Sequence, residues 1–143
     1  MRPPSPTPRL PDWPERLAEL VESRRDAPFA WGRHDCCLFA ADAVLACTGQ
    51  DPAADLRGAY ASEAEAEAML ADAGGLLALL GRIHDERGAP AIPPALAQRG
   101  DTVLIPVGND VAVGVVLGAD VAAPGPDGLV FLPLADARRA WVT

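Results

Sequence analysis

The pattern of apolar and polar positions divides the chain into a helical first half and a β-rich second half. Residues 12–27 repeat apolar side chains at helical spacing behind Asp12, which predicts an amphipathic helix that ends before Pro28. Residues 62–73 show a second helical pattern that opens on a capping box, and the leucine-rich residues 76–80 predict a short buried helical turn. The first half is therefore expected to be helical.

The central helix of the fold is expected at residues 36–48. Asp35 has the residue type of an N-cap, and Gly49 is placed to end the helix in the left-handed conformation. Asp42 is the one charged residue between them, and a helix this apolar on all sides is normally buried. Two environments are open for Asp42: an ion pair with Arg57, or a solvated or locally satisfied carboxylate.

The second half of the chain predicts an antiparallel sheet. Residues 84–99 have little periodicity and predict an irregular crossing loop. The β-branched runs 102–107 and 111–117 enclose a Gly-Asn-Asp turn, which predicts a hairpin. A second turn is expected at 124–128 and a third strand at 129–134. Helices followed by a small antiparallel sheet predict an α+β fold.

The N-terminal segment 1–11 is expected to be an extended arm, and residues 12–143 a single domain. The arm contains five prolines, so it cannot form a helix or a packed core alone. Two interpretations are open: a frayed tail, or a strap that becomes ordered only against a partner. A chain of 143 residues is long enough for one domain with a real core.

Charge and cysteine content exclude several classes of function. A net charge of −8 argues against a nucleic-acid or anionic-membrane surface. No stretch reaches the roughly 20 apolar residues that cross a bilayer, and the N-terminus lacks the apolar middle region of a secretory signal. Cys36 and Cys47 would lie about 16 Å apart on one helix, beyond disulfide reach. We therefore expect a disulfide-free protein made in the cytosol.

Cys36 is the candidate nucleophile because it lies in the first turn of the predicted central helix. The helix dipole and unpaired N–H groups stabilise a thiolate at this position. A cysteine hydrolase also needs an imidazole base, and the candidates are His34 and His84. His34 precedes the cysteine on the same loop, where it acts either as a base or as a hydrogen-bonding group of the loop, and His84 is expected to be exposed or to cap a helix C-terminus. Cys36, Cys37 and His34 lack a second pair of ligands with zinc spacing, so no metal and no cofactor are expected.

Three short motifs resemble the NlpC/P60 (papain-like) cysteine peptidases. Phe29-Ala30-Trp31-Gly32 followed by Asp35-Cys36 resembles the nucleophile segment of that family. Residues 99–104 resemble its Gly-Asp strand, and residues 113–118 resemble the strand that follows its catalytic histidine. The wider pattern is more similar to a phage-associated NlpC/P60-like group of the DUF6950 type. Its further features are Thr48-Gly49 with Asp51-Pro52, Arg57-Gly58 with Tyr60, and Ala140-Trp141.

The chain departs from the peptidase pattern at the positions that matter for catalysis. The family's Cys-Ser-Gly becomes Cys36-Cys37-Leu38, which is expected to place bulk in the substrate cleft. The base histidine falls on Ala112, which cannot accept a proton. The third predicted strand is apolar and offers no residue to orient a base.

The resemblance implies a structural component of a phage or prophage tail, near the tail tip or baseplate, built on a degenerate, non-catalytic fold. Its partners would be other tail and baseplate proteins, with no nucleic acid and no membrane insertion. It would be made in the host bacterial cytoplasm and located in the virion tail, with the arm and the apolar third strand as assembly surfaces. Two alternatives remain open: an active cysteine peptidase or amidase that cleaves cell-wall peptides during phage entry, with Cys36 as nucleophile and His34 or a partner's histidine as base, and a bacterial protein that binds a peptide or thioester.

Overall fold

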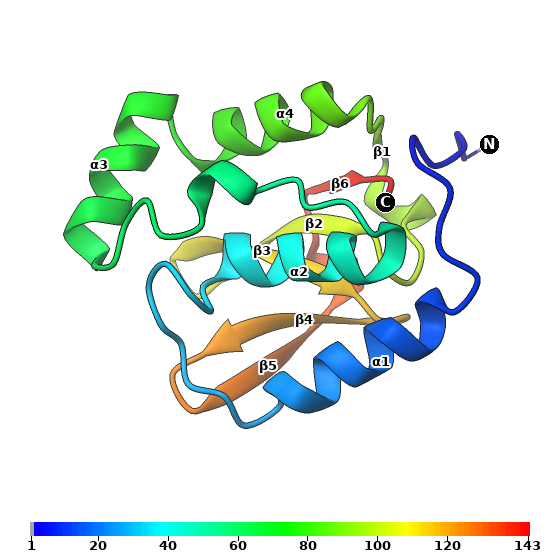
Figure 1. The fold of residues 1–143 in the computed structure, drawn as a ribbon, viewed down its shortest axis with the longest axis horizontal. Coiled ribbons are helices and arrows are strands. Elements are labelled where there is room, and N and C mark those ends of the chain that lie inside the picture. Colours follow the sequence, from blue (N-terminus) through cyan, green and yellow to red (C-terminus); the bar gives the residue numbers. More distant parts are fainter. Residues whose placement is uncertain (1) are drawn as a thin grey trace.

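Four helices precede a six-stranded antiparallel sheet in the computed structural model, which describes residues 2–143 (Figure 1). The helices are α1 (Trp13–Arg24), α2 (Cys36–Thr48), α3 (Glu63–Ala73) and α4 (Leu76–Arg87). The strands are β1 (Ala91–Ile92), β2 (Thr102–Val107), β3 (Asp110–Val116), β4 (Asp120–Gly125), β5 (Gly128–Pro133) and β6 (Arg139–Trp141), in the order β1-β6-β2-β3-β4-β5. The expected α+β fold class is confirmed. None of these helices is long and apolar enough to cross a membrane.

Helix α2 packs across the sheet, and its two ends form as the sequence predicts. The Asp35 carboxylate accepts a hydrogen bond from the Leu38 N–H at 2.9 Å, and Gly49 ends the helix with φ of 78°. The Ser62 hydroxyl caps α3 in the same way, accepting from the Glu65 N–H at 3.2 Å. These capping contacts are local, which is why the pattern of the sequence is enough to predict them.

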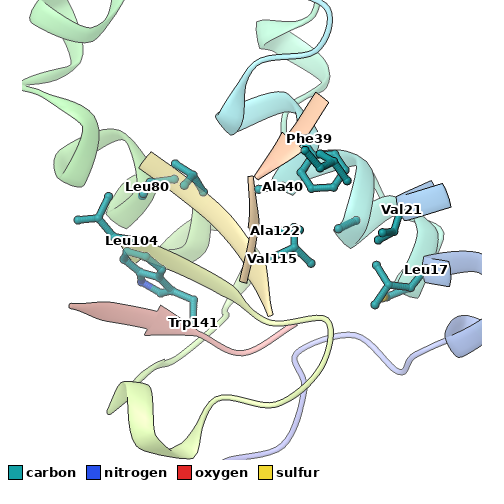
Figure 2. Close-up of a cluster of buried hydrophobic side chains, with 13 residues drawn as sticks. Leu17, Val21, Phe39, Ala40, Leu80, Leu104, Val115, Ala122 and Trp141 are labelled. Carbon is teal, nitrogen blue, oxygen red and sulfur yellow. The ribbon is translucent and has the colours of Figure 1, made fainter. Parts of the chain in front are cut away.

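The main core lies between α1, α2 and the face of the sheet that they cover. Figure 2 shows Leu17 and Val21 of α1 beside Phe39 of α2, with Trp141 and Leu104 of the sheet at the far side of the cluster. A second apolar cluster lies on the other face of the sheet. It consists of Ile92, Val103, Ile105, Val116, Val121, Ala140 and Val142. The sheet is therefore covered on both faces.

The Asp42 carboxylate, buried in the middle of α2, is held by two arginines. Arg57 lies 2.7 Å from one carboxylate oxygen and Arg24 lies 3.0 Å from the other. The Arg57 guanidinium also donates to Asp51 at 2.7 Å. The ion pair with Arg57 is thus the correct one of the two expected environments, and Arg24 adds a second cation from α1.

Several elements of the second half differ from the sequence-based prediction. Helix α4 runs through Arg87 rather than stopping near Leu80, and the predicted crossing loop contains β1. The expected turn at 124–128 is the end of β4 and a tight hairpin into β5. β4 was missed because alanine, proline and glycine make up most of it, and β6 because it has three residues and is held by pairing with the distant strands β1 and β2.

The N-terminal arm packs against its own domain rather than fraying or waiting for a partner. Arg2 and Arg9 both form ion pairs with the buried carboxylate of Asp101 at the start of the sheet. The Ser5 hydroxyl donates to the Thr143 backbone oxygen at 2.8 Å, and Arg9 donates to the same oxygen at 2.9 Å. The arm therefore holds the N-terminal segment against the C-terminal residue Thr143.

The expectation of an exposed or helix-capping His84 is wrong. Its side chain is buried and stacks on Trp141, with ring centroids 4.9 Å apart and an interplanar angle of 11°. Its Nδ1 accepts from Arg87 at 3.1 Å. The sequence predicted His84 at the edge of a loop. Because α4 continues past residue 80, His84 instead lies within a helix, on the side that faces the core.

This histidine should make folding stability depend on pH. Burial, and then the charge of Arg87, lower the pKa of His84 to about 3. The unfolded chain takes up this proton near pH 6.5, whereas the folded chain does so only near pH 3, so the contribution is complete above about pH 6.5 and is lost as the pH falls. We expect a slope of about 1.4 kcal/mol per pH unit below about pH 6 from this group. Urea unfolding across pH should show a shallower slope for His84→Phe, and equal slopes would contradict the assignment.

Candidate functional site

Cys36 opens on a cleft of about 570 Å³. The cleft lies at the N-terminus of α2 and reaches α3, α4 and the open ends of β3 and β4. Its walls are largely apolar and aromatic. They consist of Phe29, Trp31, Cys36, Glu63, Leu70, Leu76, Val107, Asp110, Val111, Ala112, Ala123, Pro124, Gly125, Pro126 and Val130. Cys36 is therefore the one cysteine of the chain that lines this cleft.

The Cys36 thiol lies against the Cys37 thiol and the backbone of β3, and both contacts favour its ionised form. The Cys37 thiol donates the stronger hydrogen bond, and the Val113 backbone N–H donates a second from β3. These contacts lower the pKa of Cys36 below its ordinary value despite burial, while the hydrogen bond and burial raise the pKa of Cys37. The N-terminus of α2 favours the thiolate in the same direction. The cleft therefore presents the more acidic of two adjacent thiols.

The sheet leaves the Val113 N–H available for this contact. β3 pairs with β2 from Asp110 to Val115, but its ladder with β4 consists of Val115↔Ala122 and Val116↔Val121. The ladder with β4 stops before Val113, and continuing its register would place Pro124 opposite Val113, where proline lacks the N–H that the Val113 carbonyl would need. β3 and β4 diverge at this point, and the cleft occupies the opening between them.

The loop before α2 is fixed by one buried carboxylate. Asp35 accepts from the backbone N–H of Gly32 at 3.0 Å and from the Tyr60 hydroxyl, in addition to capping α2. The Tyr60 pKa is raised by burial and by this carboxylate, so the phenol stays protonated and donates. Phe29 and Trp31 pack edge to face with centroids 4.7 Å apart. Asp35 is thus a positioning residue for the aromatic wall and for the first turn of the helix.

His34 is turned away from the Cys36 cleft. It is buried beside Phe39, and its Nδ1 lies 2.9 Å from Arg24 of α1. Arg24 is always a donor, so Nδ1 must accept and the neutral ring carries its proton on Nε2. Burial, and then Arg24, lower the pKa of His34. The His34 side chain therefore hydrogen-bonds to helix α1, which differs in partner from the hydrogen bonding within the loop that the sequence left open beside the base role.

The part of β3 beside Cys36, at Val111 and Ala112, carries no histidine and no other proton-accepting side chain. Ala112 lines the cleft. Side chains alternate along β3. Val113 and Val115 belong to the apolar cluster under α2, and Val116 belongs to the cluster on the other face of the sheet. By the same alternation, Val111 lies on the face of β3 that Cys36 contacts. Neither Val111 nor Ala112 can accept a proton.

The expectation that Cys37 and Leu38 place bulk in the cleft is wrong. Cys37 lines a separate small cavity against α4, and Leu38 is fully buried with Ala41 and Ala53. The helix rotates each successive side chain by about 100°, so residues next to Cys36 point into the core instead. The cleft remains open.

The ionisation of Cys36 should depend on Cys37 and not on His34. The rate of alkylation by iodoacetamide, assigned to each cysteine by fragment mass spectrometry, should rise with an apparent pKa below the ordinary thiol value. Cys37→Ala should shift this profile to higher pH because it removes the stronger hydrogen bond, whereas His34→Gln should leave it in place. A profile that moves with His34→Gln and not with Cys37→Ala would contradict this geometry.

Comparison with known proteins assigns most of the chain to one family model. Residues 8–143 match the family described as Domain of unknown function (DUF6950). No curated protein and no solved structure matches. The sequence alone did not identify the Val113 N–H, the open end of β3 or the acidic residues Glu63 and Asp110 as parts of the site. The proline at 124 was the available signal for the strand opening, because it cannot complete a ladder.

Proposed function

From the premise that the chain belongs to the DUF6950 family, we propose that it is a non-catalytic, NlpC/P60-like structural component of a phage tail, near the tail tip or baseplate. The supporting observation is the Cys36 cleft. It retains a nucleophile at the start of a central helix, and the facing strand supplies Val111 and Ala112 where a base would be needed.

The proposed assembly role places the cleft and the edge strand β5 at contacts with other tail and baseplate proteins. In β5, Phe131 is exposed and lies under the Arg25 guanidinium at 5.7 Å from the ring centroid. The arm is held by its own domain through Asp101, so it acts as an internal brace in this proposal. The protein would be made in the host bacterial cytoplasm and retained in the virion.

The alternative is an active cysteine peptidase or amidase that acts on cell-wall peptides during entry. The lowered pKa of Cys36 and the Val113 N–H favour a reactive thiolate. Because His34 is bound to Arg24 on the other side of the loop, this alternative requires a histidine from a partner chain. The active form would then exist in the assembled particle.

Quantitative mass spectrometry of purified tails tests the structural proposal. We expect a fixed number of copies per particle, set by the tail symmetry, and the same number for particles that carry Cys36→Ala. Cys36→Ala is a suitable change because Cys36 lies in an open cleft rather than in the closed core. Absence of the chain from tails, or its presence at variable trace levels, would contradict a structural role.

A further inference from the structure

We infer that the Cys36 cleft takes an extended segment of a partner chain, with basic side chains on both sides of a short apolar stretch, which pairs with the open edge of β3. This inference deepens the proposed assembly role and rests on it. Three independent features of the cleft carry it: an unpaired strand edge, an apolar wall, and acidic residues at its rim.

The edge of β3 that faces away from β2 offers backbone N–H and C=O groups for hydrogen bonds. The hairpin of β2 and β3 closes at Val107↔Asp110, so alternate residues of β3 direct their N–H and C=O groups toward β2, and Val111 and Val113 direct theirs toward the opening. The Val113 N–H already donates to Cys36. β4 diverges beyond Val115 and leaves the groups of Val111 without a ladder partner on that side. An extended segment laid in the cleft can complete this ladder.

The wall of the cleft favours small apolar side chains at alternate positions of such a segment. Phe29 and Trp31 form one wall, and Leu70 and Leu76 of the α3–α4 pair form another. Val111 is exposed on the near side. An added strand presents side chains alternately to the two sides, so every second residue would meet these surfaces.

Charge selects a basic segment. Glu63, at the start of α3, and Asp110, at the start of β3, line the cleft from two different elements, and both are exposed. The described residues that line the cleft include no basic side chain, and the chain carries a net charge of −8. Basic side chains at the ends of the bound stretch would therefore meet complementary charge, and acidic ones would be repelled.

The chain's own basic arm does not fit this cleft. Arg2 and Arg9 are already bound to Asp101. The prolines of residues 3–11 lack the N–H groups that strand pairing requires. The occupant is therefore a segment of another protein with alternating small apolar residues and arginine or lysine at its ends.

Fluorescence anisotropy with short synthetic probes tests the inference. The main probe is a labelled, acetylated and amidated hexapeptide Arg-Thr-Val-Thr-Val-Arg. One comparison probe carries glutamate in place of both arginines, and another carries N-methyl groups on both valines to block pairing. We expect the arginine probe to bind at least about tenfold more tightly than either comparison probe. Equal binding of all three probes, or no binding of the arginine probe, would overturn the inference.

Matched variants separate the cleft from the general negative charge. Glu63→Gln with Asp110→Asn should weaken binding of the arginine probe about tenfold at low salt. Glu67→Gln with Asp120→Asn should not, because these exposed acidic residues lie on the same helix and at the start of a neighbouring strand but do not line the cleft. Equal weakening of binding by the two double variants would overturn the inference. So would self-association of this chain into a dimer that dissociates only in Glu63→Gln with Asp110→Asn, because the occupant would then be a second copy. Tail composition is measured separately, so failure of this assay and failure of the structural role are distinguishable.

Discussion

Replacement of Asp101 by alanine is expected to lower the free energy of unfolding by about 3–5 kcal/mol. The side chain is fully buried. Its carboxylate accepts from the backbone N–H groups of Gln98 at 2.7 Å and Thr143 at 3.0 Å, and it pairs with both Arg2 and Arg9. Asp101→Ala leaves two backbone donors and two largely buried cations without a partner, which costs more than the pair itself is worth.

Urea unfolding at neutral pH measures this loss of stability. Two further variants serve as comparisons, one with no expected effect and one with a smaller expected loss. Asp120→Ala removes an exposed carboxylate at the start of another strand and should change stability by less than about 0.5 kcal/mol. Arg2→Gln removes one partner of Asp101 and should cost about 1 kcal/mol, because Arg9 and both N–H groups remain. A loss for Asp101→Ala no larger than that for Asp120→Ala would show that the arm and the sheet are not joined at this carboxylate.

Gly32→Ala is expected to destabilise the fold by about 4 kcal/mol or to prevent folding. Gly32 has φ of 77°, and a Cβ at this residue would lie 2.0 Å from the backbone oxygen of Tyr60. The Tyr60 backbone cannot move away from this Cβ as easily as the end of a flexible side chain could. The loop would have to shift, and with it the Asp35 hydrogen bonds and the aromatic wall of the cleft.

Gly58→Ala is the matched control because Gly58 has nearly the same backbone angle, φ of 76°, and open space where the Cβ would be. It should cost about 1–2 kcal/mol, which is the price of the left-handed conformation alone. The difference between the two variants, measured by urea unfolding, isolates the close approach of Gly32 and Tyr60. Equal losses would contradict the packing of this loop.

Local signals in the sequence predicted the helices that position Cys36. Asp35 and Gly49 give α2 its two ends, and Ser62 begins α3, because each contact is made within a few residues of the chain. The pair of β-branched runs predicted the β2–β3 hairpin for the same reason. These elements contain enough of the site for the sequence to place Cys36 and Ala112 in one cleft.

Long-range contacts account for what the sequence did not predict. The pairing of β6 with β2 and with β1 depends on residues far apart in the chain. The burial of His84 follows from a stack on Trp141, which no local pattern encodes. The orientation of His34 is set by Arg24 from another helix, so its distance from Cys36 along the chain could not show which way the ring turns.

The proposed structural role requires that Cys36, in a cleft whose described lining residues include no histidine, does not catalyse hydrolysis. Its most direct test is the release of soluble peptides and amino groups from purified peptidoglycan by the wild-type chain and by Cys36→Ala, with the isolated chain and with purified tails as separate samples. We expect equal background release from both variants in each sample. Release that requires Cys36, from the chain or from the tails, would contradict it.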